Sequence, residues 1–150
     1  MDFPFEATTC TAEETEAVGA ALANALLADG TLPRFVAMYG DLGVGKTAFT
    51  RGFASVLAPR SAVRSPTFAI VNEYRGDGAS VYHFDMYRIA DEDDLYSVGF
   101  YDYLVGNGYC IAEWCENIPY ALPDERIEVT IEKTSADSPD ERRIVCLVAQ

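Results

Sequence analysis

Hydrophobic positions recur along the chain with two different periods, and together these periods predict an α/β fold. Apolar residues return every three or four positions over 12–28, directly after Thr11-Ala12-Glu13-Glu14, which matches a helix-capping box. Continuous apolar runs over 34–39 and 109–113 predict buried strands. Mixed runs of this kind, with helical segments between strands, are typical of a sheet covered by helices on both faces.

Shorter patterns complete the prediction. Residues 2–9 alternate and predict an edge strand, while 68–74 and 80–87 predict a hairpin around the turn Arg75-Gly76-Asp77-Gly78. The acidic run 91–94 indicates the start of a helix, since negative charge is favourable at a helix N-terminus, and another short helix is predicted over 100–104. Finally, 126–133 and 141–149 predict two antiparallel strands joined by an Asp/Ser/Pro turn.

The stretch Gly40-Asp41-Leu42-Gly43-Val44-Gly45-Lys46-Thr47 fits G-x-x-x-x-G-K-[ST], the phosphate-binding loop. It lies between the predicted strand 34–39 and a helical pattern over 48–57, which is the context that the motif requires. Its glycines permit positive φ angles, so that successive N–H groups can converge on an anion near a helix N-terminus. The alternative is a glycine-rich turn that only caps a helix, but the flanking strand and helix favour a nucleotide-phosphate site.

The motif assigns a role to each polar side chain of the loop. Lys46 would reach the β- and γ-phosphates, and the Thr47 hydroxyl would ligate Mg²⁺. Thr11 either only caps its helix or also contacts the base, because that helix precedes the loop strand. The candidate nucleotide-binding residues are Thr11, Asp41, Leu42, Gly43, Val44, Gly45, Lys46, Thr47 and Ala48.

Two runs within the predicted strands end in a carboxylate, the aromatic run 81–85 at Asp85 and the apolar run 109–113 at Glu113. The C-terminal end of a buried parallel strand is where ligands sit in α/β sheets and where a second Mg²⁺ contact is placed. Either carboxylate could serve, and each could equally be a solvated strand end. Thr67 is a candidate switch residue or simply the β-branched start of a strand. His83, the only histidine, is predicted to be packed or hydrogen-bonded rather than a catalytic base.

Composition narrows the function classes. The net charge is −13 and the only lysines are Lys46 and Lys133, so direct DNA or RNA binding is not expected. The four cysteines form no C-x-x-C pair and predict neither a zinc site nor a disulfide framework. The N-terminal residues lack the pattern of a secretory signal, and no apolar run is long enough to span a bilayer. A single cytoplasmic domain over 1–150 is expected.

The chain resembles the TsaE (YjeE) family of small bacterial ATPases, which work with TsaB and TsaD to make threonylcarbamoyladenosine at position 37 of tRNAs. The resemblance covers most of the chain. Besides the phosphate loop, it rests on the segments Thr11-Ala12-Glu13-Glu14-Thr15, Ser65-Pro66-Thr67-Phe68, Tyr82-His83-Phe84-Asp85-Met86-Tyr87-Arg88, Asp102-Tyr103 and Glu113-Trp114.

This resemblance implies an α/β, P-loop NTPase-like three-layer fold with a mixed, mainly parallel sheet that binds ATP and Mg²⁺. It implies that Thr47 and Glu113 hold the metal, with Asp85 near the metal or the attacking water and Thr67 in a switch-like segment. Lys46, Asp85, Glu113 and Thr67 are thus the candidate catalytic residues. The partners implied are the TsaB and TsaD subunits, with tRNA contacted only through the complex.

Three functions compete at this stage. The first is an ATPase that is slow alone and stimulated by a partner, since no residue is an obvious arginine finger; the candidates Arg51, Arg64 and Arg88 suit surface or structural roles. The second is a P-loop small-molecule kinase, although no arginine-rich lid is evident. The third is a non-catalytic, nucleotide-gated binding module. A GTPase is disfavoured because the guanine motif Asn-Lys-x-Asp is missing from the sequence.

Overall fold

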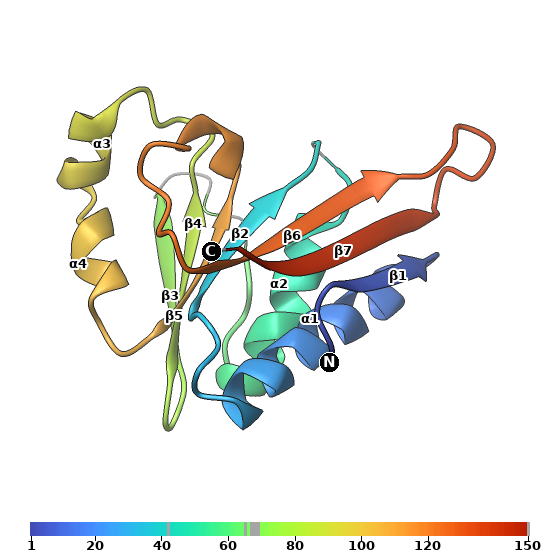
Figure 1. Cartoon of the computed structure of the whole chain (residues 1–150), viewed down its shortest axis with the longest axis horizontal. Helices are drawn as coiled ribbons and strands as arrows, with labels where there is room; N and C mark the ends of the chain where they lie inside the picture. The colour runs from blue at the N-terminus through green and yellow to red at the C-terminus, as the bar shows by residue number, and fades with distance from the viewer. Residues whose placement is uncertain (42, 65, 67–69, 150) are drawn as a thin grey trace.

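The structure is a computed structural model that describes residues 1–41, 43–64, 66 and 70–149. Within these residues the chain forms strands, α-helices and one short 3₁₀ helix, η1 (Figure 1). In chain order they are β1 (Phe5–Thr9), α1 (Ala12–Ala28), β2 (Phe35–Tyr39), α2 (Lys46–Leu57), β3 (Val71–Arg75), β4 (Ser80–Asp85), α3 (Glu92–Ser97), α4 (Phe100–Leu104), β5 (Tyr109–Glu113), η1 (Cys115–Asn117), β6 (Arg126–Lys133) and β7 (Arg142–Ala149).

All the described strands form one seven-stranded sheet in the order β1-β7-β6-β2-β5-β4-β3. Its centre is parallel: β2 pairs in parallel with β6 and with β5, and β5 pairs in parallel with β4. Both flanks are antiparallel, with β3 paired to β4 on one side and β7 paired to both β6 and β1 on the other. The predicted mixed sheet is confirmed, with parallel pairing at its centre and antiparallel pairing on both flanks.

The sheet separates two hydrophobic cores. Side chains alternate across a strand, and β2 accordingly sends Val36 and Met38 into one core and Phe35 and Ala37 into the other. The first core lies under α1 and α2, while the second lies under α3, α4 and η1; Figure 1 shows these two groups of helices on opposite faces. The predicted three-layer, P-loop-type fold is confirmed.

Most predicted boundaries agree with the structure, and α1 and α4 agree at both ends. The strand β4 ends at Asp85 rather than Tyr87, because the Asp85 side chain accepts a hydrogen bond from the Tyr87 N–H and turns the chain (3.0 Å). The strand β3 begins at Val71, and residues 68 and 69 of the predicted strand lie outside the described residues.

The capping box before α1 is present in a modified form. Thr11 caps the helix as predicted, since its hydroxyl accepts a hydrogen bond from the Glu14 N–H (3.1 Å). Glu14 reaches back one residue further than usual and accepts from the Cys10 N–H (3.1 Å). Among the residues that the structure covers, no helix has the length and hydrophobicity needed to cross a membrane.

Candidate functional site

The phosphate-binding loop connects the end of β2 to the start of α2. Gly43 has φ 78° and Gly45 has φ 114°, in the left-handed region that a side chain would make costly. Gly40, where the loop leaves β2, also has a positive φ, so the predicted backbone conformation of the three glycines is confirmed. The first turn of α2 begins at Lys46, and the loop therefore ends at a helix N-terminus, where backbone N–H groups favour an anion.

Lys46 is nearly buried although it carries a charge. Its ammonium nitrogen donates to the Gly40 carbonyl oxygen (2.7 Å) and lies 3.8 Å from the centroid of the Trp114 ring, a cation–π contact. Burial lowers the pKa of Lys46, and this effect is opposed by the surrounding carboxylates, in decreasing order Glu113, Glu116, Asp85 and Asp41. The lysine is thus partly desolvated, and acidic side chains stand around it.

One cavity of about 270 Å³ brings together three of the four predicted catalytic side chains, those of Lys46, Asp85 and Glu113. Its described lining comprises Gly43, Gly45, Lys46, Thr47, Asp85, Glu113 and Trp114. We call it the loop cavity. Both strand-end carboxylates reach it because β4 and β5 run parallel in a register that pairs Asp85 with Glu113. The sequence left open which carboxylate serves the site, and the structure places both there.

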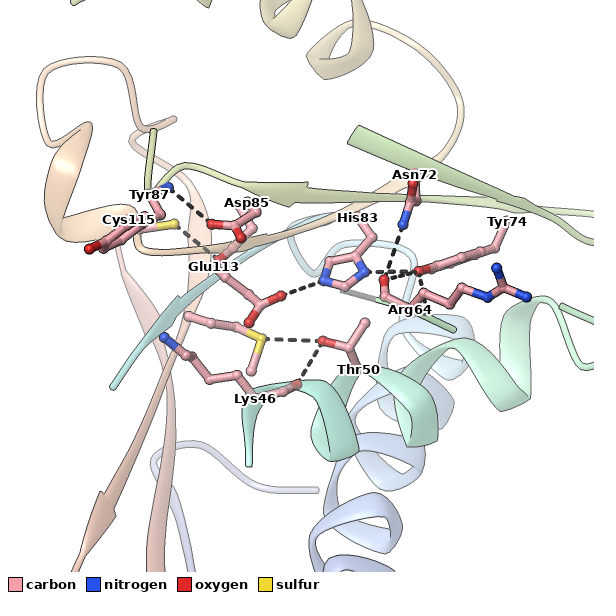
Figure 2. Close-up of polar contacts among 12 residues, drawn as sticks. Lys46, Thr50, Arg64, Asn72, Tyr74, His83, Asp85, Tyr87, Glu113 and Cys115 are labelled. Atoms are coloured by element: carbon pink, nitrogen blue, oxygen red, sulfur yellow. Dashed lines mark hydrogen bonds and ion pairs between the residues drawn. The ribbon is translucent and has the colours of Figure 1, made fainter. Parts of the chain in front are cut away.

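The two carboxylates have different surroundings. Glu113 is 4% exposed, and its Oε2 lies 2.6 Å from the Nε2 atom of the fully buried His83, as Figure 2 shows. Asp85 is half-buried and accepts one hydrogen bond from the Tyr87 backbone. Glu113 is therefore held by a fully buried partner, whereas Asp85 is more open to solvent. The prediction that His83 is packed and hydrogen-bonded is confirmed.

A second cavity of about 210 Å³ lies on the other side of the loop, against the start of α1. Thr11, Val44 and Ala48 line it, together with Gly43 and Gly45. Predicted nucleotide-binding residues therefore border both cavities. Asp41 is exposed within the loop itself. Two further candidates, Leu42 and Thr67, lie outside the described residues, and their roles stay predictions.

Arg142 is a residue that the sequence analysis did not find. It begins β7, lines the second cavity, and donates from Nε to the carbonyl oxygen of Val44 in the loop (2.9 Å). The oxygen and the hydrogen of a trans peptide point in opposite directions, so this bond fixes the orientation of the Gly45 N–H as well. No local pattern marks Arg142, because its contact joins residues 98 positions apart.

Trp114 is a second residue to which the sequence analysis assigned no role of its own. Its ring covers the Lys46 ammonium at the wall of the loop cavity. Its φ of 59° makes it the only residue other than glycine with a positive φ in the described part of the chain. This bend follows Glu113 directly and turns the ring toward the loop.

Comparison with known proteins agrees with this geometry. Residues 9–144 match the family model described as threonylcarbamoyl adenosine biosynthesis protein TsaE. The chain belongs to the TsaE family. A TsaE relative from Bacillus subtilis (strain 168), named as a tRNA threonylcarbamoyladenosine biosynthesis protein, is 40% identical over 129 residues, covering 86% of this chain and 78% of the relative.

Two further matches support the same family assignment. A protein of the same name from Haemophilus influenzae is 40% identical over 115 residues, which cover 77% of this chain and 70% of the relative. The crystal structure of Bacillus subtilis YdiB has a TM-score of 0.73 and 32% sequence identity, covering 99% of this chain and 87% of that chain. The resemblance to the TsaE family inferred from the sequence is confirmed.

The TsaE site thus combines three kinds of chemistry at one edge of the sheet. The loop glycines and the start of α2 suit phosphate oxygens, Lys46 supplies a positive charge, and Thr47 with the two carboxylates supplies oxygen donors. Such a set can hold a phosphate chain and a hard divalent cation side by side. The predicted metal residues Thr47, Asp85 and Glu113 all border the same cavity.

Proposed function

We propose that this TsaE family member binds ATP with Mg²⁺ and hydrolyses it in support of tRNA threonylcarbamoyladenosine synthesis, as a partner of TsaB and TsaD. The observation that carries the proposal is the loop cavity, where Lys46, Thr47, Asp85 and Glu113 meet beside a glycine loop. The names of the relatives support the tRNA modification, and the family resemblance supports the two partners. Because the net charge is −13, we expect tRNA to be contacted through the complex rather than by this chain alone.

The side chains of the loop cavity fit Mg²⁺. This cation prefers oxygen ligands, often one or two carboxylates together with phosphate oxygens, and the cavity offers a hydroxyl at Thr47 and carboxylates at Asp85 and Glu113. Sulfur and imidazole ligands would favour other metals, and the one imidazole, that of His83, is engaged with Glu113. When bound, Mg²⁺ would neutralise negative charge on the β- and γ-phosphate oxygens.

In this proposal each residue has one task in the reaction. The loop amides and the Lys46 ammonium bind the phosphate oxygens, and Thr47 and Glu113 hold the metal. Asp85, the more accessible carboxylate, orients a water molecule for in-line attack on the γ-phosphorus. The bond between the γ-phosphorus and the bridging oxygen breaks, and the products are ADP and inorganic phosphate. The carboxylates around Lys46 repel an unneutralised triphosphate, so binding should depend on Mg²⁺.

Calorimetry with ATP and Mg²⁺ tests binding, and the two lysines provide a matched pair of variants. Lys46→Met removes the ammonium from the loop cavity, whereas Lys133→Met removes the same charge from an exposed position at the end of β6. We expect the wild type and Lys133→Met to bind alike and Lys46→Met to bind at least about tenfold more weakly, since one lost charged hydrogen bond costs roughly 1.5–3 kcal/mol. A wild-type protein that gives no binding heat would overturn the proposal.

Phosphate release then tests hydrolysis. We expect a low rate for the protein alone and a higher rate with TsaB and TsaD, because positioning by a partner completes such sites. Asp85→Asn should retain nucleotide binding and lose most of the hydrolysis. Transfer of the γ-phosphate to a metabolite in place of release would identify a kinase, and an unaltered tRNA modification rate with Asp85→Asn would identify a non-catalytic module.

A further inference from the structure

His83 joins the loop cavity to the opposite end of the β3–β4 hairpin through a line of hydrogen bonds. Its Nε2 lies 2.6 Å from Glu113 Oε2, and its Nδ1 lies 2.9 Å from the Tyr74 hydroxyl oxygen (Figure 2). The same hydroxyl oxygen accepts from the Arg64 N–H (3.1 Å) and lies 2.9 Å from the Arg64 carbonyl oxygen. All three side chains of this line are at most 5% exposed, so water does not compete for the bonds.

The sheet places His83 where it can act on Glu113. His83 and Asp85 lie two residues apart on β4 and therefore on the same face, and the β4–β5 register sets Asp85 opposite Glu113. The side chain of Glu113 consequently has His83 on one side and the loop cavity on the other. Figure 2 shows the carboxylate between the imidazole ring and Lys46, which rises from the start of α2.

When the ring is neutral and the carboxylate is ionised, counting protons fixes the tautomer of the ring. An ionised carboxylate can only accept, so a neutral His83 must carry its proton on Nε2 and donate it to Glu113. The Nδ1 atom is then an acceptor, and the Tyr74 hydroxyl is the donor available to it. The Arg64 carbonyl oxygen does not depend on that hydroxyl, because the Asn72 side chain also donates to it (3.0 Å).

We propose that His83 is a positioning residue for Glu113, and that Tyr74 in turn fixes His83 as the Nε2–H tautomer. The inference rests on the function proposed above. The bond to His83 fixes Oε2 and the rotation of the carboxylate, so that Oε1 is presented to the metal or to a metal-bound water. Groups that orient the ligands of a metal in this way change metal affinity by about 10–100-fold when removed. A histidine that only fills the core would leave metal affinity unchanged.

The tautomer can be measured without any nucleotide. Because His83 is the only histidine of the chain, ¹⁵N-labelled histidine reports this ring alone by NMR. We expect a protonated, pyrrole-type Nε2 and an unprotonated, pyridine-type Nδ1 near neutral pH. Tyr74→Phe removes only the hydroxyl, and we expect it to move the Nδ1 resonance. A ring with its proton on Nδ1, or an even mixture of tautomers in the wild type, would overturn the proposal.

Titration of Mg²⁺ at fixed ATP then tests the effect on the metal. In His83→Gln the longer amide places an N–H near the former Nε2, whereas in His83→Asn the shorter amide cannot reach Glu113. We expect His83→Asn to weaken the Mg²⁺ affinity by about 10–100-fold and His83→Gln to restore it within a few fold. The affinity for ATP in EDTA, which should be much weaker than that with Mg²⁺ in every form of the protein, should stay the same in both variants. Equal Mg²⁺ affinity in wild type and His83→Asn, or a parallel loss of ATP affinity in EDTA, would refute a positioning role.

Two measurements keep this test decisive. If His83→Asn does not fold, as thermal unfolding would show, Tyr74→Phe takes its place; it keeps the buried ring and should still weaken Mg²⁺ affinity measurably. If the wild type binds no ATP, the proposed function fails together with the role toward the metal, whatever the tautomer is. If the wild type binds ATP with Mg²⁺ and all three variants match it, only the role of His83 fails.

Discussion

Helices α1 and α2 approach each other backbone to backbone at two glycines, and this contact allows a quantitative prediction. A Cβ atom added at Gly52 would lie 1.8 Å from the Glu16 carbonyl oxygen, and one added at Gly19 would lie 2.1 Å from the Phe49 carbonyl oxygen. Ordinary contacts of a Cβ begin near 3.4 Å. Gly52→Ala therefore requires the helices to separate by up to about 1.6 Å, because neither obstacle is a side chain that could rotate away.

Two effects of opposite sign set the size of the change in stability. Alanine is favoured over glycine inside a helix by about 1 kcal/mol. Overpacking typically costs about 1–3 kcal/mol and can cost more, and here it also pulls Leu22, Phe49 and Phe53 away from the core that they share. We expect the steric effect to dominate and Gly52→Ala to lower the free energy of unfolding by about 2 kcal/mol. For a chain of this size that corresponds to a fall in Tm of roughly 4–8 °C.

Thermal and denaturant unfolding measure the effect, with Gly30→Ala as the control. A Cβ at Gly30 would meet nothing within 4 Å, so this variant should stay within about 0.5 kcal/mol of the wild type. The double variant Gly19→Ala/Gly52→Ala should cost less than the sum of the single variants, because one separation of the helices makes room for both methyl groups. A Gly52→Ala protein as stable as the wild type would refute the close contact of α1 and α2.

Two further predictions concern the site and the cysteines. Trp114 is the only tryptophan, and its ring lies against the Lys46 ammonium. Binding of ATP with Mg²⁺ should draw Lys46 away from the ring and so change the fluorescence of Trp114. An identical change in the variant Lys46→Met would contradict this prediction. Burial raises the pKa of three cysteines to about 12, namely those of Cys110, Cys115 and Cys146. In the folded protein, a thiol reagent at pH 8 should therefore modify only the exposed Cys10, and after denaturation it should modify all four cysteines. Modification of a second cysteine in the native state would contradict this prediction.

The sequence predicted those features that depend on neighbouring residues. The bounds of α1 follow from a capping threonine and a helical period, and the loop before α2 follows from the spacing of its glycines and Lys46. The strand end at Glu113 was also visible as an apolar run that stops at a carboxylate, whereas the strand through Asp85 was predicted two residues too long. Local preference and hydrophobic period determine such features, and both are written in short stretches of chain.

Features that depend on register or on distant contacts could not be predicted in the same way. The sequence offered Asp85 and Glu113 as alternatives, and only the parallel register of β4 and β5 shows that both border one cavity. The hydrogen bond from His83 to Glu113 was equally hidden, although the position of His83 two residues before Asp85 indicated that both side chains share a face of the sheet. The contact of Trp114 with Lys46 depends on a left-handed backbone angle that no pattern in the sequence indicates.

The bond from Arg142 to the Val44 carbonyl shows how far the anion site extends through the fold. A loop that offers amide hydrogens must keep its carbonyl oxygens turned outward, since an inward oxygen would repel a phosphate. Arg142 supplies this orientation from β7, a strand at the opposite end of the sequence. The β6–β7 hairpin thus fixes the direction in which a peptide group of the loop points, and the anion site is complete only when β7 has joined the sheet.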